Sequence, residues 1–180
     1  MTQITTSCKT DNPLIDVLLI SHGTLSSFDL QASRRFYEEV PGFEVIQHAT
    51  VAMLIRKGTA HTYVVVETGE PSTMGLLDHN GLDVGSREAV DKAHQALTAA
   101  REKYGIRRIH KPVEQHGTYS FYFSDLDGNW WEIQDGLPGG NGSLYGDPKF
   151  DFTGRTDIDA EVMQHSIDVE RAEQASGDPS

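Results

Sequence analysis

The chain repeats one order of strand and helix signals, and this duplication restricts the folds open to it. Residues 14–69 predict a strand, a helix and three strands, and residues 76–137 predict the same series. A β-α-β-β-β module of this size cannot cover both faces of its own sheet, whereas two modules side by side enclose a shared hollow. We therefore expect an α+β fold in which two paired modules form one curved mixed sheet.

Local signals set the limits of each element. Asp29 is placed to cap the first helix and Pro41-Gly42 to end it, while the second helix begins at Ser86. A turn is expected at residues 125–129, where Asp, Gly and Asn cluster. The predicted elements are strands at 17–21, 43–47, 52–56, 62–67, 81–84, 108–111, 119–124 and 130–134, and helices at 30–40 and 86–104.

Length and composition favour one domain with flanking segments. We expect an N-terminal extension at 1–13, the two-module domain at 14–137 and, because apolar residues become rare, an acidic tail at 138–180. The formal net charge of -12 disfavours nucleic acid and anionic membranes as partners. The single Cys8, the lack of a signal-peptide core and the lack of an apolar run of about 20 residues favour a cytoplasmic protein.

Three metal-binding residue types recur at the ends of apolar runs: His22, His79 and Glu132. A lone histidine near a strand end is more often structural, but these two occupy the same place in both modules. Glu132 lies between Trp131 and Ile133, where an unpaired buried carboxylate would be costly, unless strand alternation points it away from Trp131. Two imidazoles and a carboxylate leave open metal positions, so the set predicts a catalytic metal centre in the hollow.

Five stretches of the chain resemble the vicinal oxygen chelate superfamily. They lie, in the family's order and spacing, at residues 21–23, 28–30, 35–43, 78–84 and 125–133. The resemblance covers about residues 14–136 and implies paired β-α-β-β-β modules around a metal held by His22, His79 and Glu132. A homodimer is an expectation from the family.

Two further segments resemble the type I extradiol ring-cleavage dioxygenases of that superfamily. Residues 60–66 match the segment with their acid/base histidine, here His61, and residues 120–123 match the segment with their active-site tyrosine, here Tyr122. His116 resembles a further histidine near this loop. The resemblance implies Fe(II), O2 as co-substrate and a catechol that is cleaved to a ring-opened semialdehyde. The single-domain length is similar to that of L-DOPA 2,3-dioxygenases.

Other interpretations remain open at this stage. Tyr122 and His61 also fit the roles of ordinary strand residues. Glu67 lies on the strand that carries a fourth protein ligand in glyoxalase-like members, and such a site would support a lyase or isomerase. A metal-free drug-binding protein of the bleomycin-resistance kind would instead need a hydrophobic cleft.

Overall fold

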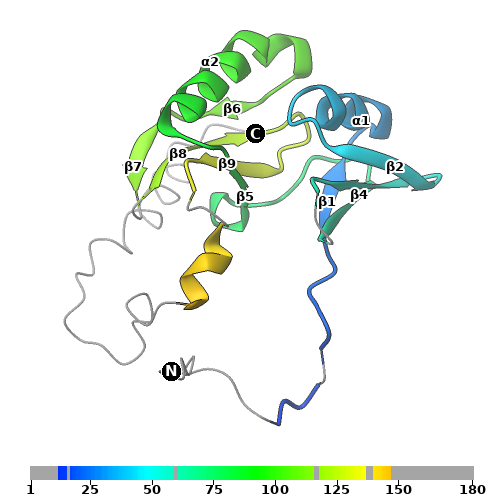
Figure 1. The fold of residues 1–180 in the computed structure, drawn as a ribbon. Coiled ribbons are helices and arrows are strands. Elements are labelled where there is room, and N and C mark those ends of the chain that lie inside the picture. The colour runs from blue at the N-terminus through cyan, green and yellow to red at the C-terminus, as the bar shows by residue number, and fades with distance from the viewer. Residues whose placement is uncertain (1–11, 16, 59–60, 116–117, 137–139, 147–180) are drawn as a thin grey trace.

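The computed structural model describes residues 12–15, 17–58, 61–115, 118–136 and 140–146. Their strands form a four-stranded and a five-stranded sheet, and both α-helices lie on the same side of the sheets (Figure 1). The α+β fold with two β-α-β-β-β modules is therefore confirmed, although the strands hydrogen-bond as two sheets rather than one. Within the described residues, no helix is long and apolar enough to cross a membrane.

The first module follows the sequence signals closely. Asp29 caps its helix, because its side chain accepts hydrogen bonds from the backbone N–H groups of Gln31 (2.9 Å) and Ala32 (3.0 Å). The sheet order is β1-β4-β3-β2, with β1 parallel to β4. The elements are β1 (His22–Ser27), α1 (Leu30–Glu39), β2 (Glu44–Ala49), β3 (Ala52–Arg56) and β4 (Thr62–Glu67).

The second module repeats the pattern with one additional strand. Ser86 caps its helix, and Gly105 ends it with the positive φ that glycine adopts without strain. The sheet order is β5-β9-β8-β6, β7 pairs with β8, and β5 is parallel to β9. The elements are β5 (Asn80–Asp83), α2 (Arg87–Tyr104), β6 (Arg108–Ile109), β7 (Val113–Gln115), β8 (Thr118–Ser124) and β9 (Trp130–Gln134), with 3₁₀ helices η1 (Leu76–Asp78) and η2 (Asn141–Gly146).

One apolar core connects the two modules on the helical side of the sheets. The ring of Trp131 on β9 lies 6.0 Å from Tyr37 on α1, 5.9 Å from Phe43 and 5.7 Å from Tyr63 on β4. Offset and edge-to-face contacts of this kind add to the stabilisation from burial. The fully buried Val90 of α2 belongs to the same cluster, so this core holds both helices to both sheets.

The turn between β8 and β9 inserts buried polar groups into the first module. The carboxylate of Asp125 accepts hydrogen bonds from the Tyr37 hydroxyl (2.8 Å) and the Trp131 indole N–H (3.1 Å). The amide of Asn129 pairs with the backbone of Ser26 in β1, donating to its carbonyl oxygen (2.9 Å) and accepting from its N–H (3.2 Å). Because buried polar groups are costly when unpaired, this turn fixes how the modules meet.

Asp127 completes the same connection beside the start of α1. Its carboxylate accepts hydrogen bonds from the backbone N–H of Phe28 (2.7 Å) and the Ser33 hydroxyl (2.5 Å). Burial raises the pKa of Asp127 to about 6, although both hydrogen bonds favour the charged form. The buried carboxylate therefore binds its proton more tightly in the folded chain than in the unfolded chain.

One predicted strand is wrong. Residues 17–21 were expected to form the first strand, but β1 begins at His22 and the residues before it lie in irregular, exposed chain. The other predicted strands and both helices are present within a few residues of their expected limits, and β7 was missed. Apart from residues 140–146, the tail predicted at 138–180 lies outside the described residues, as does the extension at 1–11.

Asp127→Asn should change how stability depends on pH. A folded pKa of about 6 lies above the unfolded value, so the contribution of the protonated carboxyl is lost as pH rises from about 4 to about 6. Between pH 4 and 7, wild type should lose about 2–3 kcal/mol relative to the variant. Urea unfolding of both proteins across this range measures the difference, and a pH-independent difference would contradict the assignment.

Candidate metal centre

The parallel pairing of β5 with β9 brings His79 and Glu132 together. Gly81 of β5 is the register partner of Glu132, and His79 lies two residues before it, between η1 and β5. The His79 Nε2 atom lies 3.3 Å from the Glu132 Oε2 atom. These two of the three predicted metal ligands therefore form a pair at the start of β5.

Strand alternation places Glu132 on the opposite face of β9 from the core. Trp131 and Ile133 both belong to the core on the helical side, so Glu132 points to the other face, yet it is buried there. Its Oε1 atom accepts a hydrogen bond from the Ser120 hydroxyl (2.7 Å) and a longer one from the Gln115 amide (3.4 Å). These contacts hold one oxygen and leave Oε2 facing His79.

Hydrogen bonding fixes the orientation of the His79 ring. Its Nδ1 atom lies 2.7 Å from the Leu76 carbonyl oxygen, and because a carbonyl only accepts, Nδ1 carries a hydrogen. Nε2 then faces the Glu132 carboxylate either with a second proton or with its lone pair. A nitrogen lone pair that faces a carboxylate is repelled unless a cation lies between the two. His79 and Glu132 are therefore placed to share a proton or to bind a metal ion.

The two side chains shift each other's pKa. Burial is the largest influence on His79 and disfavours its charged form, but the hydrogen bonds to Glu132 and Leu76 and the negative charge of Glu132 outweigh it and raise the pKa. Burial is also the largest influence on Glu132, yet the hydrogen bonds from His79 and Ser120 lower its pKa overall. A carboxylate that stays ionised despite burial suits a metal ligand.

Tyr122 and a small apolar cluster line the same face. Tyr122 of β8 is the register partner of Glu132, and its ring meets the His79 ring at 4.9 Å. Leu76, Tyr122 and Trp130 form a cluster separate from the main core. His110, for which the sequence predicted no role, lies with its ring 5.4 Å from Trp130 and 6.2 Å from Tyr122.

His22 lies apart from this pair within the chain. It is the exposed first residue of β1, and its Nδ1 atom contacts the Ser21 hydroxyl at 2.8 Å. Among the described residues, no group of three His, Cys, Asp or Glu side chains is placed to hold a metal ion. The structure therefore brings together two of the predicted ligands and leaves the third on the other sheet.

His61 lies beside the start of β4, near His22 rather than His79. Its ring meets that of Tyr63 at 5.1 Å, and its Nδ1 atom is 3.4 Å from the Ile20 carbonyl oxygen. Thr62, between His61 and Tyr63, is the register partner of His22. By strand alternation its side chain points to the side of the sheet opposite that of Tyr63. These contacts do not test the acid/base role of His61, and His116 lies outside the described residues, so both roles stay predictions.

Glu67 stands at the far end of β4 from His22. Its register partner is Ser27, and its Oε2 atom accepts a hydrogen bond from the backbone N–H of Leu30 (2.8 Å) at the start of α1. A carboxylate in this position is stabilised by the helix dipole. Thr62, which carries no carboxylate, occupies the position beside His22, so β4 places no fourth carboxylate ligand there.

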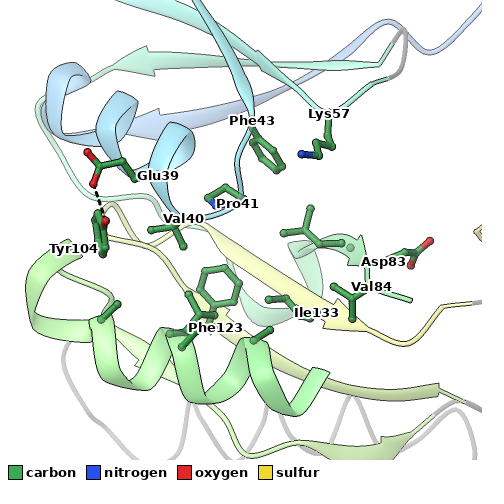
Figure 2. Close-up of a pocket in the computed structure, with 16 residues that line it drawn as sticks. Glu39, Val40, Pro41, Phe43, Lys57, Asp83, Val84, Tyr104, Phe123 and Ile133 are labelled. Atoms are coloured by element: carbon green, nitrogen blue, oxygen red, sulfur yellow. Dashed lines mark hydrogen bonds between the residues drawn. The ribbon is translucent and has the colours of Figure 1, made fainter. Parts of the chain in front are cut away.

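A large apolar cavity lies elsewhere, on the helical side between the modules (Figure 2). It has a volume of about 790 Å³ and is lined by core-facing Phe123 and Ile133, by β5 and by α2. The Tyr104 hydroxyl donates a hydrogen bond to Glu39 (2.6 Å) at its rim. Since Ile133 lines this cavity and the adjacent Glu132 faces the other way, the cavity and the His79–Glu132 pair lie on opposite faces of β9.

The pair has the dimensions of a metal site. Two neighbouring ligand atoms of an octahedral site with bonds of about 2.1 Å are about 3.0 Å apart, and Nε2 and Oε2 are 3.3 Å apart. An imidazole held by a carbonyl and a carboxylate held by a hydroxyl are also the outer contacts that metal ligands usually have. The pair therefore fits two neighbouring ligand positions of a divalent cation.

Glu132→Gln should lower the pKa of His79 in metal-free protein. The change removes the negative charge that favours the imidazolium, while burial and the Leu76 contact remain. An NMR titration of the His79 ring in chelator-treated protein measures the shift. Glu67→Gln, a matched change in a carboxylate that binds the α1 terminus, should leave the His79 titration as in wild type; equal effects would contradict the pairing.

Comparison with known proteins agrees with this fold. The Glyoxalase/Bleomycin resistance protein/Dioxygenase superfamily profile matches residues 19–133. No curated protein matches the sequence.

Solved structures share the fold at low sequence identity. The fosfomycin resistance protein FosX from Listeria monocytogenes is 20% identical, with 68% of this chain and 93% of that chain covered and a TM-score of 0.56. FosX from Mesorhizobium loti is 19% identical, with 69% and 97% covered and a TM-score of 0.53. An integron cassette protein from the Halifax Harbour sewage outfall metagenome is 24% identical, with 66% and 98% covered and a TM-score of 0.51.

The profile match spans well over half of the chain, and it includes both modules and the His79–Glu132 pair. The chain therefore belongs to the glyoxalase/bleomycin resistance protein/dioxygenase superfamily.

Proposed function

We propose that this protein is a metal-dependent enzyme that acts on a substrate with two adjacent oxygen atoms. The divalent cation would be held by His79 and Glu132, with His22 as the third ligand that the sequence predicts. The observation that carries the proposal is the His79–Glu132 pair, buried on the face of β9 away from the core and oriented by Leu76 and Ser120. Packing of the main core does not explain this pair, because that core lies on the opposite face of β9.

The donor set suits a cation that keeps positions open for substrate. Two neutral imidazoles and one carboxylate leave a divalent ion with a net positive charge and about three free coordination positions. Bound there, the ion would polarise substrate oxygens as a Lewis acid. A Listeria FosX structure contains Mn(II) and 1S,2S-dihydroxypropylphosphonic acid, a ligand with two adjacent hydroxyl groups, and this supports the same substrate class here.

The first candidate reaction is a glyoxalase-like one without net oxidation, such as an isomerisation or an addition to an activated substrate. The superfamily match and the FosX-like fold favour it. In that reaction the Tyr122 hydroxyl would donate a hydrogen bond to the substrate, because its ring lies against His79 on the face of Glu132. Leu76 and Trp130 would exclude water from the same side.

The second candidate is extradiol cleavage of a catechol such as L-DOPA, with Fe(II) and O2. Two observations favour it: Tyr122 is in register with Glu132, and Glu67 binds the start of α1 instead of adding a fourth carboxylate beside His22. The metal would supply positions for the two catechol oxygens and for O2. Both atoms of O2 would enter the product as the ring bond beside the diol breaks, giving a ring-opened semialdehyde. His61 would accept and return the phenolic proton.

Oxygen uptake separates the two candidates. Protein loaded with Fe(II) is mixed with aerobic catechols, including L-DOPA, while oxygen and the yellow ring-opened product are followed. In parallel, Mn(II)-loaded protein is tested anaerobically on an epoxide and on a thiol-aldehyde adduct by NMR. Uptake with a yellow product establishes cleavage, and anaerobic conversion establishes the glyoxalase-like reaction. Protein shown to hold metal that does neither would contradict the proposed activity.

Ser120→Ala should weaken Mn(II) binding about 10-fold, because removal of a group that orients a metal ligand costs about 10-fold to 100-fold in affinity. Ser120 donates its hydroxyl hydrogen to Glu132. Equilibrium dialysis measures the affinity. Ser124→Ala is the matched control, since Ser124 is buried on the same face of β8 but is the register partner of Trp130. Equal losses in the two variants would contradict the positioning role.

His79→Ala and His61→Ala should have separable effects. His79→Ala removes a ligand and should abolish stoichiometric metal binding. His61→Ala should retain metal, but its turnover rate should fall at least about 100-fold, the scale of general acid–base catalysis. Metal analysis and steady-state kinetics of both variants check this. Equal metal loss in the two would show that the acid/base role of His61 is misassigned.

A further inference from the structure

The apolar cavity on the helical side of the sheets has the size of a small-molecule site. Its volume of about 790 Å³ falls within the range of about 300–1,000 Å³ that is usual for ligand sites. Residues of both modules line it, and ligands often bind at such junctions. Because Ile133 faces the cavity and Glu132 faces the other side of β9, a ligand here would not touch the metal pair.

The wall of the cavity is mostly apolar. Phe43 lies on the side of the first module, Phe123 and Ile133 come from the sheet of the second module, and Leu97 comes from α2 (Figure 2). Water against such a wall finds few hydrogen-bond partners. A ligand with an apolar body would therefore gain free energy by replacing that water and removing apolar surface from solvent.

The two carboxylates near the cavity already have partners. Glu39 accepts hydrogen bonds from the Tyr104 hydroxyl (2.6 Å) and the Arg35 guanidinium (3.2 Å). Asp83 accepts a hydrogen bond from the side-chain amide of Gln134 (2.6 Å), which is its register partner on β9. Strand alternation places Asp83 and Gln134 on the face of the metal pair, so the Asp83 carboxylate points away from the cavity (Figure 2).

Lys57, which directly follows β3, brings a positive charge to the cavity. Figure 2 shows its amino group directed toward Phe43. The Nζ atom donates one hydrogen bond, to the Gly42 carbonyl oxygen (2.9 Å), and within the described part of the chain it pairs with no carboxylate. An ammonium group has three hydrogens to donate, so two remain for an anionic ligand group.

We propose that this cavity binds a small amphipathic carboxylate. The carboxylate would lie on the Lys57 ammonium, where charge-assisted hydrogen bonds are stronger than neutral ones. The apolar body would lie between Phe43, Phe123 and α2. A single negative charge fits better than several, because the chain as a whole has a formal net charge of -12. This site is separate from the metal centre, and it stands whether or not the protein binds a metal.

Calorimetric titration of the metal-free full chain with octanoate tests the recognition of the charge. Wild type should bind one octanoate, and Lys57→Gln should weaken binding about 10-fold, the scale of one hydrogen bond to a charged group. The neutral 1-octanol should bind equally to both proteins. Lys92→Gln is the matched control, because Lys92 is an exposed lysine of α2 outside the cavity. A wild type that binds no octanoate, or equal octanoate affinity in Lys57→Gln, overturns the proposal.

A second pair of variants tests the location. Ala96 and Ala99 are both exposed on α2, but only Ala96 lines the cavity. Ala96→Trp should fill it and weaken octanoate binding at least about 10-fold, whereas Ala99→Trp should bind as wild type does. Equal affinity in the two variants, with circular dichroism showing both folded, contradicts the location.

Methyl NMR of wild type tests the same location without any substitution. Octanoate should shift the methyl signals of Leu82 and Ile133, which line the cavity, and leave that of Ile46, an exposed residue of β2, unchanged. Octanoate that binds without shifting Leu82 or Ile133 would lie elsewhere and would overturn the proposal.

Discussion

The turn at residues 125–129 is the interaction on which the rest of the structure depends. It carries three buried polar side chains, Asp125, Asp127 and Asn129, into the first module, where they bind α1, β1 and the chain between them. Each would be costly to bury unpaired, so these hydrogen bonds favour the observed arrangement of the two modules over others. Because β9 begins directly after the turn, this contact also sets where Trp131 and Glu132 lie relative to α1 and β1.

Strand alternation places the core-forming side chains of β9 on one face and the candidate metal ligand on the other. Trp131 packs against aromatic rings of the first module, while Glu132 takes the opposite face with His79, Tyr122 and Ser120. The same shift of one residue separates the apolar cavity at Ile133 from the metal pair. A change of register on β9 would exchange the two faces, and for this reason core packing and the candidate site depend on the same strand pairing.

Much of the fold was predictable because its signals are local. The cap at Asp29, the end of the first helix just before Pro41-Gly42, and strands 52–56, 62–67 and 130–134 agree with the structure. The strand at 17–21 was wrong because a short apolar run indicates residues that favour burial but does not show that a neighbouring strand is there to pair with them. His79 and Glu132 were predicted from their place in the repeat. Ser120, Gln115 and His110 were missed, since their positions follow from the register of strands that the sequence leaves open.

The central claim is that two imidazoles and one carboxylate hold one cation. Pulsed electron paramagnetic resonance of Mn(II) bound to the full chain measures it most directly, because imidazole nitrogens on the metal modulate the echo and selective ¹⁵N labelling of histidine changes that modulation. The account predicts two histidine nitrogens on each Mn(II). One histidine nitrogen would remove His22 from the site, and none would contradict the metal centre itself.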